Sequence, residues 1–455
     1  MIQGWAEERP DELALIRGGQ AWTSRELQQR VEAYAAWLQR TTDPDRPIAF
    51  VAHPEPWVVA LIWAAISIGK VVLPLHPRWP EAERAALLLR LPPTTFLSAD
   101  PDPPPAQPKE LPVPDTAPLA WFGTSGSTGQ PKAVELTRGA FWASAAAYQD
   151  RIPDQPGDRW WLGLPLSHVG GFSILIRAAS GRRPVVLAPA FDPETFSAQL
   201  EAHGATLVSL VPTMVRRLLP RRPPPVLRVV LLGGASASPE LLDEARALGW
   251  PIHTTYGLTE AAAMVTLQGP GERGHDAGRP LAGNRIEVRQ GRIHVAGPTL
   301  LRRYVGDGAP PTPLEEGWLD TGDLGEIDEA GRLWVHARRQ DLILRGGENV
   351  YPAEVERVLE QAPGVRAACV FGVEDPEWGQ RVVCALSVEP GFLGRGLALW
   401  LEGRLAKFKW PVEVALLQTW PELSLGKPDR AAIRRIAEGQ RVPLAEAVSP
   451  AAALD

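Results

Sequence analysis

Hydrophobic residues recur at helical spacing near the beginning of the chain. The residues that fall on one face of a helix drawn through 24–38 are Leu27, Val31, Tyr34 and Leu38. Thr23 and Glu26 have the spacing of a capping box, in which each side chain accepts a hydrogen bond from the backbone of the other residue. The pattern therefore predicts a helix over 24–38 that begins at Thr23.

Further along, short apolar runs alternate with longer segments. The runs of strand length are IAFVA (48–52), VVLPL (71–75), PVVLA (184–188) and VVLLGG (229–234). Between the first two lies the apolar run Trp57–Gly69, which is shorter than the roughly 20 residues that span a bilayer and therefore predicts a buried helix. Strands that alternate with helices predict a parallel α/β architecture.

The pattern changes from about residue 284. Short β-like segments with turns follow there, NRIEVRQGRIHVAG and GRLWVHARRQ, and a new helix is predicted near Pro352. We therefore predict an α/β protein with a large N-terminal domain over 1–339, which includes a β-rich subdomain over 284–339. A small α+β C-terminal domain is predicted over 340–455.

Composition narrows the class of protein. Hydrophobic residues make up 45% and charged residues 22% of the chain, as in an ordinary globular protein. The formal net charge of −6 argues against a nucleic-acid partner. The two cysteines, Cys369 and Cys384, cannot form a disulfide framework, and the N-terminus lacks a basic region followed by an apolar run. We therefore expect a cytoplasmic protein without a membrane span.

Residues 124–132 read TSGSTGQPK and are rich in small and hydroxylated residues. Glycines allow close approach of a backbone, and hydroxyl and amide groups donate hydrogen bonds to anionic oxygens. Lys132 adds a positive charge. The kinase-type pattern GxxxxGK[ST] is absent, since Ala133 follows the lysine. The segment therefore predicts a phosphate-binding loop of another kind.

Four further motifs follow in order: TYGLTE (255–260), GWLDTGDLG (317–325), RRQDLILRGGENVYPAEVE (338–356) and LSLGKPDR (423–430). Together with the loop they resemble the motifs of the adenylate-forming superfamily, which includes acyl- and aryl-CoA synthetases, adenylation domains of peptide synthetases and luciferases. The resemblance implies that a carboxylate attacks the α-phosphate of ATP, giving an acyl-adenylate and pyrophosphate. A thiol, usually that of coenzyme A, then displaces AMP. It also implies a mobile C-terminal domain and a Mg²⁺ requirement.

The resemblance assigns roles residue by residue. The implied ATP-phosphate residues are Thr124, Ser125, Gly126, Ser127, Thr128, Gly129 and Lys132, with Thr259 at the α-phosphate. The implied Mg²⁺ ligands are Glu260 and Thr128. The implied adenine and ribose residues are Gly233, Gly234, Ala235, Tyr256, Gly257, Asp323 and Arg338. Gly346 and Gly347 would line the path of the pantetheine of CoA. Lys427 would be the catalytic lysine that enters the site for adenylation, and Gln340 would be the hinge.

A second, narrower resemblance indicates which carboxylic acid is the substrate. LGLPLSHVGGFSILIRA (162–178), LVSLVPTMVRRLL (207–219) and AGRPLAG (277–283) resemble o-succinylbenzoate–CoA ligases of menaquinone and phylloquinone biosynthesis. Arg177, in an otherwise apolar run, would bind the benzoate carboxylate that is not activated. His168 would close over the acyl pocket, with catalytic and substrate contacts, and Ser209 and Thr213 would form its wall.

Alternatives for the substrate stay open at this point. Gly170 and Ser167 depart from the residues common in these ligases, which changes the polarity or volume of the pocket. The other interpretations are a different aryl- or medium-chain acid–CoA ligase, or a stand-alone adenylation enzyme that loads a carrier protein. The oligomeric state is also open, a homodimer included.

Overall fold

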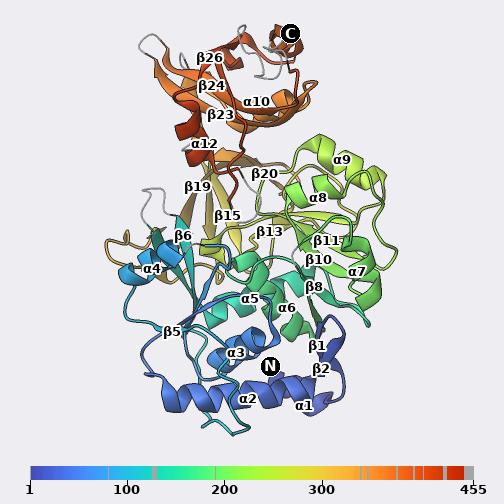
Figure 1. Ribbon diagram of the computed structural model, residues 1–455, viewed down its shortest axis with the longest axis vertical. Coiled ribbons are helices and arrows are strands. Elements are labelled where there is room, and N and C mark those ends of the chain that lie inside the picture. Colours follow the sequence, from blue (N-terminus) through green and yellow to red (C-terminus); the bar gives the residue numbers. More distant parts are fainter. Residues whose placement is uncertain are drawn as a thin grey trace. The chain divides into compact units, whose positions relative to one another are not determined.

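The computed structural model describes residues 2–79, 81–125, 131–189, 191–338, 341–345, 348–375, 378–392, 395–402, 404–423 and 428–444. Its strands form four sheets in this part of the chain (Figure 1). The predicted α/β class is confirmed. Among the described residues, no helix combines the length and apolarity that crossing a bilayer requires.

The large sheet has mostly parallel central strands. In order across the sheet, its strands are β14 (Arg279–Pro280), β13 (Thr266–Leu267), β12 (Ile252–Tyr256), β11 (Val229–Leu232), β10 (Leu207–Leu210), β8 (Trp160–Leu162), β9 (Val185–Leu187), β1 (Leu13–Arg17) and β2 (Gln20–Thr23). The predicted runs 184–188 and 229–234 are therefore strands β9 and β11. The hairpin β1–β2 was not predicted.

A second sheet, here called the loop-bearing sheet, carries the two strands on either side of the predicted phosphate loop. In order, its strands are β17 (Arg303–Val305), β7 (Pro131–Thr137), β6 (Pro118–Ser125), β4 (Val72–Leu75), β3 (Ile48–Val51) and β5 (Thr95–Leu97). The small sheet consists of β15 (Arg285–Arg289), β16 (Arg292–Ala296), β19 (Trp318–Ile327), β18 (Leu314–Glu315) and β20 (Leu333–Arg338).

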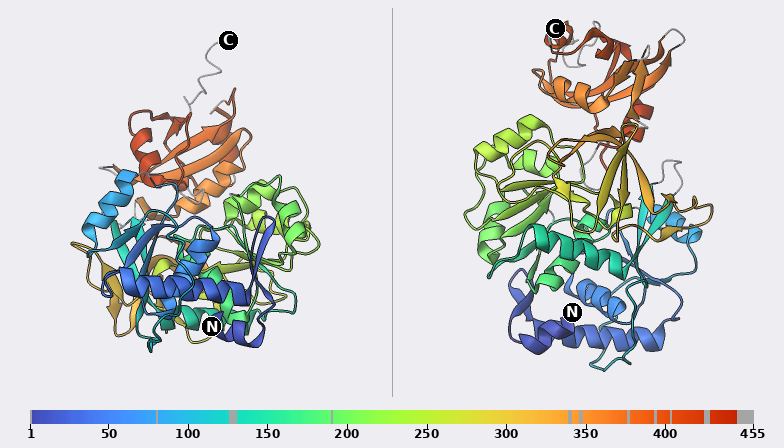
Figure 2. Two further views of the ribbon diagram at one scale, coloured as in Figure 1. Left: turned by 60° about the horizontal axis from the view of Figure 1, so that its bottom comes forward. Right: turned by 180° about the vertical axis from the view of Figure 1, so that it is seen from behind.

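Helices cover both faces of the first two sheets. They are α1 (Ile2–Glu8), α2 (Ser24–Thr41), α3 (Pro56–Ser67), α4 (Glu81–Arg90), α5 (Arg138–Arg151), α6 (Val169–Gly181), α7 (Phe196–His203), α8 (Pro212–Leu218) and α9 (Pro239–Ala247), with the 3-10 turn η1 (Thr259–Ala261). The two views in Figure 2 show the long helix α2 beside α3. The predicted buried helix is α3, which is buried from Val58 to Ile66.

Alternate residues of the strands face different helical layers, as the two-residue period of a strand requires. In the large sheet, Trp160 and Leu207 pack with α3, α5 and α6, whereas Trp161 and Val208 pack with α7, α8 and α9. The loop-bearing sheet also faces α3, α5 and α6, and α4 covers its other face. Helices α5 and α6 thus lie between the two sheets (Figure 1), where they can carry side chains into a site at the strand ends.

The C-terminal sheet has a core of its own. Its strands are β22 (Glu348–Val350), β21 (Ile343–Arg345), β24 (Gly379–Val388), β25 (Glu413–Leu416), β26 (Val442–Pro443) and β23 (Val365–Asp375). The accompanying helices are α10 (Pro352–Glu360), α11 (Arg395–Leu401), η3 (Lys407–Lys409) and α12 (Arg430–Ala437). Helices α10 and α11 pack on one face, and α12 packs on the other through Ile433 and Ala437.

The contacts within the chain divide it into two compact units. The N-terminal unit comprises Met1–Glu287, His294–Asp320 and Ile327–Leu333, and the C-terminal unit comprises Val288–Ile293, Thr321–Glu326 and Trp334–Asp455. The region 284–339, predicted as one subdomain, contributes to both units. The boundary predicted at Arg339–Asp341 stays a prediction, because residues 339 and 340 lie outside the described residues.

The start of helix α2 confirms the predicted capping box and makes it testable. The Thr23 hydroxyl accepts from the backbone N–H of Glu26 at 3.2 Å, and the Glu26 carboxylate accepts from the backbone N–H of Thr23 at 2.8 Å. We expect Thr23→Ala to lower the free energy of unfolding by about 1 kcal/mol, measured by urea denaturation. Thr41→Ala, at the exposed other end of the helix, is the control, and an equal loss in both variants would contradict the capping argument.

Candidate active site

The predicted phosphate loop joins two paired strands. Strands β6 and β7 are antiparallel, with Thr124 opposite Lys132 and Ser125 opposite Pro131. The predicted phosphate ligands Gly126, Ser127, Thr128 and Gly129 lie outside the described residues. The register nevertheless places Thr124 and Lys132 beside each other at the base of the loop.

Lys132 and Glu260 both contact one aromatic residue that the sequence interpretation missed. The Lys132 ammonium lies over the ring of Tyr304, 3.3 Å from its centroid. The Tyr304 hydroxyl donates to Glu260 Oε1 at 3.0 Å. Burial lowers the pKa of Lys132, and the Glu260 carboxylate opposes that shift. Burial also raises the pKa of Tyr304, with Glu260 adding to the rise, so the phenol keeps its proton and remains a donor.

Glu260 and Thr259 lie on η1, after strand β12. The backbone must turn sharply here: a side chain at Gly257 would approach the carbonyl oxygen of Ala263 to 1.5 Å, so only glycine fits. Ala262 and Ala263 both have positive φ, 48° and 88°, which costs backbone energy and is often found at functional sites. Tyr256, predicted beside the adenine, is buried at the end of β12.

The predicted adenine wall follows strand β11. Gly234 has a φ of +80°, a conformation that favours glycine, and Gly234 and Ala235 are exposed. A side chain at Gly233 would meet Thr255 at 2.7 Å. These residues therefore form an open turn at the carboxyl end of a parallel strand, where ligands of open α/β sheets commonly bind.

Arg177 is a buried cation on α6 with an exposed fraction of 3%. It donates to the Ser173 hydroxyl at 3.2 Å and, more weakly, to the Ser209 hydroxyl at 3.4 Å. Its guanidinium lies 4.8 Å from the ring centroid of Trp160 and 5.4 Å from that of Tyr148. The predicted wall residue Ser209 thus contacts Arg177, whereas Thr213, on α8, is half-buried and keeps its role as a prediction.

The buried Arg177 carries a charge that no ion pair among the described residues balances. No ion pair within the described ranges involves Arg177, and its Nε is buried without a partner. Burial lowers its pKa to about 10, and the nearby Tyr148 oxygen and Asp154 carboxyl group oppose the shift. Arg177 is therefore a cation at neutral pH. A buried cation without a paired carboxylate is costly, and a bound carboxylate would offset that cost.

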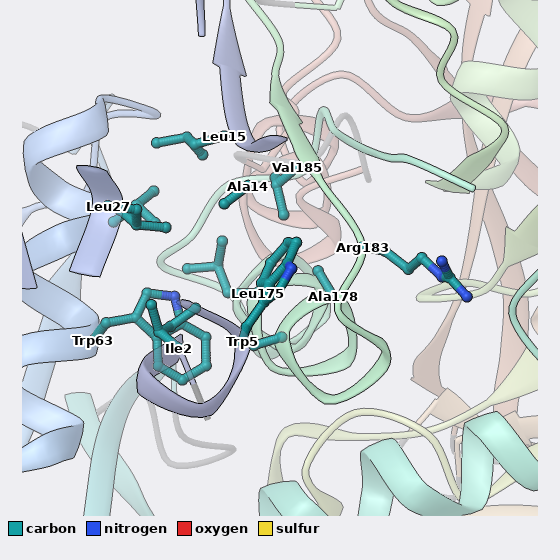
Figure 3. A pocket seen from close by; sticks show the side chains of 12 residues that line it. Ile2, Trp5, Ala14, Leu15, Leu27, Trp63, Leu175, Ala178, Arg183 and Val185 are labelled. Carbon is teal, nitrogen blue, oxygen red and sulfur yellow. The ribbon is translucent and has the colours of Figure 1, made fainter. Parts of the chain in front are cut away.

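The N-terminal segment supports helix α6 from another side. Figure 3 shows an apolar cavity at which Trp5 of α1 lies close to Leu175 and Ala178 of α6. Leu175 and Ala178 lie three residues apart and share a face, which differs from the face of Ser173 and Arg177. Packing by α1 thus fixes α6 without occupying the face that carries Arg177.

His168 lies at the start of α6, and its ring lies close to that of His76, a second residue that the sequence interpretation missed. The rings of His168 and His76 lie 5.5 Å apart. His76 follows strand β4 and has an exposed fraction of 1%. Its Nδ1 accepts from the backbone N–H of Arg78 at 3.0 Å, so the neutral ring carries its proton on Nε2, which is buried without a hydrogen-bond partner.

His76 makes stability depend on pH. Burial, helped by Arg78, lowers its pKa from 6.5 to about 4. The folded state accommodates only the neutral His76 ring easily. Its contribution to the free energy of unfolding is therefore fully present above pH 6.5 and is lost as the pH falls toward 4. Between pH 7 and 5.5 we expect His76 to account for a loss of about 1 kcal/mol.

The difference in unfolding free energy between wild type and His76→Asn, measured in urea at both pH values, isolates this contribution. Other titrating groups such as Asp154 are present in both proteins, so their contributions cancel in this difference. Parallel pH profiles for the two proteins would contradict the assignment.

The C-terminal unit holds the remaining predicted residues. Asp323 is buried on β19, and Arg338 ends β20. Gly346, Gly347 and Lys427 lie outside the described residues. Near Lys427, Arg430 donates to Glu356 at 2.6 Å, and Asp429 caps α12 through the backbone N–H of Ala432.

The N-terminal unit carries two of the predicted cations, Lys132 at the base of the loop and the buried Arg177 on α6. Together with the carboxylate of Glu260, which contacts Tyr304, they form the kind of site expected of an enzyme that adenylates a carboxylate. The comparisons agree. The profile of the AMP-binding enzyme family matches residues 2–115 and 88–305, and that of the AMP-binding enzyme C-terminal domain matches residues 354–427. The chain belongs to the AMP-binding enzyme family.

Several similar proteins are 2-succinylbenzoate–CoA ligases. The 2-succinylbenzoate–CoA ligase of Bacillus pumilus (strain SAFR-032) is 31% identical over 92% of this chain and 94% of its own. The o-succinylbenzoate CoA synthetase of Bacillus subtilis, in complex with its acyl-adenylate intermediate, is 29% identical, with a TM-score of 0.88 over 94% of this chain and 96% of its own. The same synthetase with ATP and magnesium gives a TM-score of 0.86 at 28% identity over 95% and 98%.

Proposed function

We propose that the protein is an ATP-dependent, AMP-forming acid–CoA ligase that converts 2-succinylbenzoate to 2-succinylbenzoyl-CoA in menaquinone or phylloquinone biosynthesis. The similar 2-succinylbenzoate–CoA ligases support the reaction. The observation that carries the choice of acid is Arg177, a buried cation that no described carboxylate pairs with. Its Nε and one terminal nitrogen can form a bidentate fork with a carboxylate.

The acid has two carboxylates, of which one must be activated and the other must be bound without reacting. In the proposed arrangement Arg177 binds the benzoate carboxylate and holds it away from ATP. The succinyl carboxylate is then the one that attacks the α-phosphorus, as the bond to the pyrophosphate oxygen breaks. In the second step the CoA thiolate attacks the acyl carbonyl and AMP leaves. Holding the reactants in this geometry removes much of the entropic barrier.

Lys132 and Lys427 would supply positive charge where it is needed for adenylation. Lys132 would contact the phosphates from the base of the loop, and Lys427 would approach the attacking carboxylate from the C-terminal unit. Asp323, as an acceptor, would bind the ribose hydroxyls, with Arg338 beside it. Gly346 and Gly347 would leave space for pantetheine.

Mg²⁺ fits the residues that are present. In the described ranges no group of three or more His, Cys, Asp or Glu side chains could hold a metal ion. Mg²⁺ commonly binds through one or two carboxylates plus substrate phosphates, and Glu260 is such a carboxylate, oriented by Tyr304. When bound, the ion would offset the negative charge of the phosphates. Cys369 and Cys384 are buried and free, which supports a reducing, cytoplasmic location.

The test of the proposed function is ATP- and CoA-dependent AMP release over a panel of acids. The panel contains 2-succinylbenzoate, benzoate, 4-coumarate, hexanoate and several amino acids. Strong preference for 2-succinylbenzoate is the expected result. Turnover of another acid alone would overturn the proposed substrate, and AMP formation that needs a carrier protein instead of CoA would overturn the proposed thiol.

A further inference from the structure

Tyr304 holds two oppositely charged side chains at once. The Lys132 ammonium lies over the face of its ring, and the Glu260 carboxylate accepts from its hydroxyl. The negative face of an aromatic ring attracts a cation, and a hydrogen bond to a carboxylate is stronger than one between neutral groups. One side chain therefore satisfies both charges without bringing them into direct contact.

The backbone makes this arrangement rigid. Strand β17 pairs with β7, so that Tyr304 lies opposite Val134, close to Lys132. The same segment binds η1, because the backbone N–H of Leu301 donates to the carbonyl of Glu260 at 2.7 Å. The base of the loop and the Glu260 turn, which are far apart in the sequence, are thus joined through residues 301–304.

We propose that Tyr304 is a positioning residue that keeps Lys132 and Glu260 from pairing with each other, so that the lysine remains available to the ATP phosphates and the carboxylate to Mg²⁺. This inference rests on the proposed function of the two charged residues. Without the ring, two flexible side chains of opposite charge would form a direct ion pair. Each would then be withdrawn from its ligand.

Two substitutions separate the two contacts. Tyr304→Phe keeps the ring over Lys132 and removes the hydrogen bond to Glu260, so we expect the Mg²⁺ concentration for half-maximal ATP binding to rise about threefold. Tyr304→Leu also removes the ring, and we expect ATP to bind about tenfold more weakly even without Mg²⁺. Adding Glu260→Gln to Tyr304→Leu should release Lys132 and return Mg²⁺-free ATP binding to the level of Glu260→Gln alone.

The experiment measures ATP binding by calorimetry with the full chain, with and without Mg²⁺ and without any acid. Tyr34→Phe is the matched control, because Tyr34 also donates to a carboxylate, that of Asp100, in the same unit. Its ATP binding should not change.

The outcomes are distinct. Rescue by Glu260→Gln supports the inference, and Tyr304→Phe, which preserves the packing, tests it even where Tyr304→Leu folds poorly. Wild-type ATP affinity in both Tyr304 variants, or a double variant as weak as Tyr304→Leu, would overturn the inference but not the proposed function. A wild-type protein that binds no ATP would overturn both.

Discussion

Replacing Lys427 with alanine should lower the rate of adenylate formation by about a hundred- to a thousandfold, the usual effect of removing one charged donor from a transition state. Negative charge accumulates there as the carboxylate approaches the α-phosphate. The thioester step should keep its rate, since its nucleophile attacks an adenylate that has already formed. Pyrophosphate release measures the first step, and CoA consumption with synthetic acyl-adenylate measures the second.

The matched control is Lys407→Ala, because Lys407 is an exposed lysine of the same unit on η3. It should leave both half-reactions unchanged. The described residues near Lys427 are well anchored: Glu422 and Pro428 form a β-bridge, and Arg430 bonds to Glu356. The variant should therefore fold. An equal fall in both half-reactions would argue against a lysine that acts in adenylation alone.

The sequence predicted those parts of the fold that local patterns determine. Helix α2 was predictable because Thr23 and Glu26 form a local capping box, and α3 because its apolar run is longer than a strand. The short helix α1 and hairpin β1–β2 were not, because their burial depends on partners far along the chain. Trp5, for example, packs in the cavity formed with Leu175 of α6.

The same distinction applies to the site. Lys132 and Glu260 belong to recognisable motifs, and Arg177 was conspicuous as a charge in an apolar run. Tyr304 carries no such signal. Tyr304 reaches Lys132 because β17 pairs with β7. It reaches Glu260, 44 residues away, because Leu301 bonds to the backbone of Glu260. A pattern in one segment does not reveal a pairing of that kind. The signal for His76 was its position directly after a buried strand, where ligand-binding residues of α/β sheets commonly lie.

Replacing Arg177 with leucine should raise the KM for 2-succinylbenzoate by about 10- to 150-fold, equivalent to about 1.5–3 kcal/mol for a hydrogen bond to a charged group. Arg177→Lys should also bind the acid poorly, because an ammonium cannot form the two parallel hydrogen bonds of a guanidinium. The KM for ATP should not change. Steady-state kinetics at saturating ATP and CoA measure the effect.

A substrate analogue locates the lost contact. 3-Benzoylpropionate lacks the ring carboxylate, so its KM should differ little between wild type and Arg177→Leu. Arg138→Leu, which removes a partly exposed arginine at the start of α5, should leave both KM values unchanged. If Arg177→Leu raised both KM values equally, the arginine would be supporting the pocket rather than binding the carboxylate.

The stability of Arg177→Leu provides an independent test of whether Arg177 serves substrate binding or packing. A buried cation without a paired carboxylate costs folding free energy, and replacing it with an apolar side chain is often neutral or stabilising. Arg177→Leu should therefore unfold at the same or a higher urea concentration than wild type while losing affinity for the acid. An arginine retained for packing would show the reverse, a lower unfolding midpoint with an unchanged KM. In the proposed arrangement the carboxylate of the bound acid would offset the cost of the buried cation. Selection for the reaction would then retain an arginine that weakens the fold.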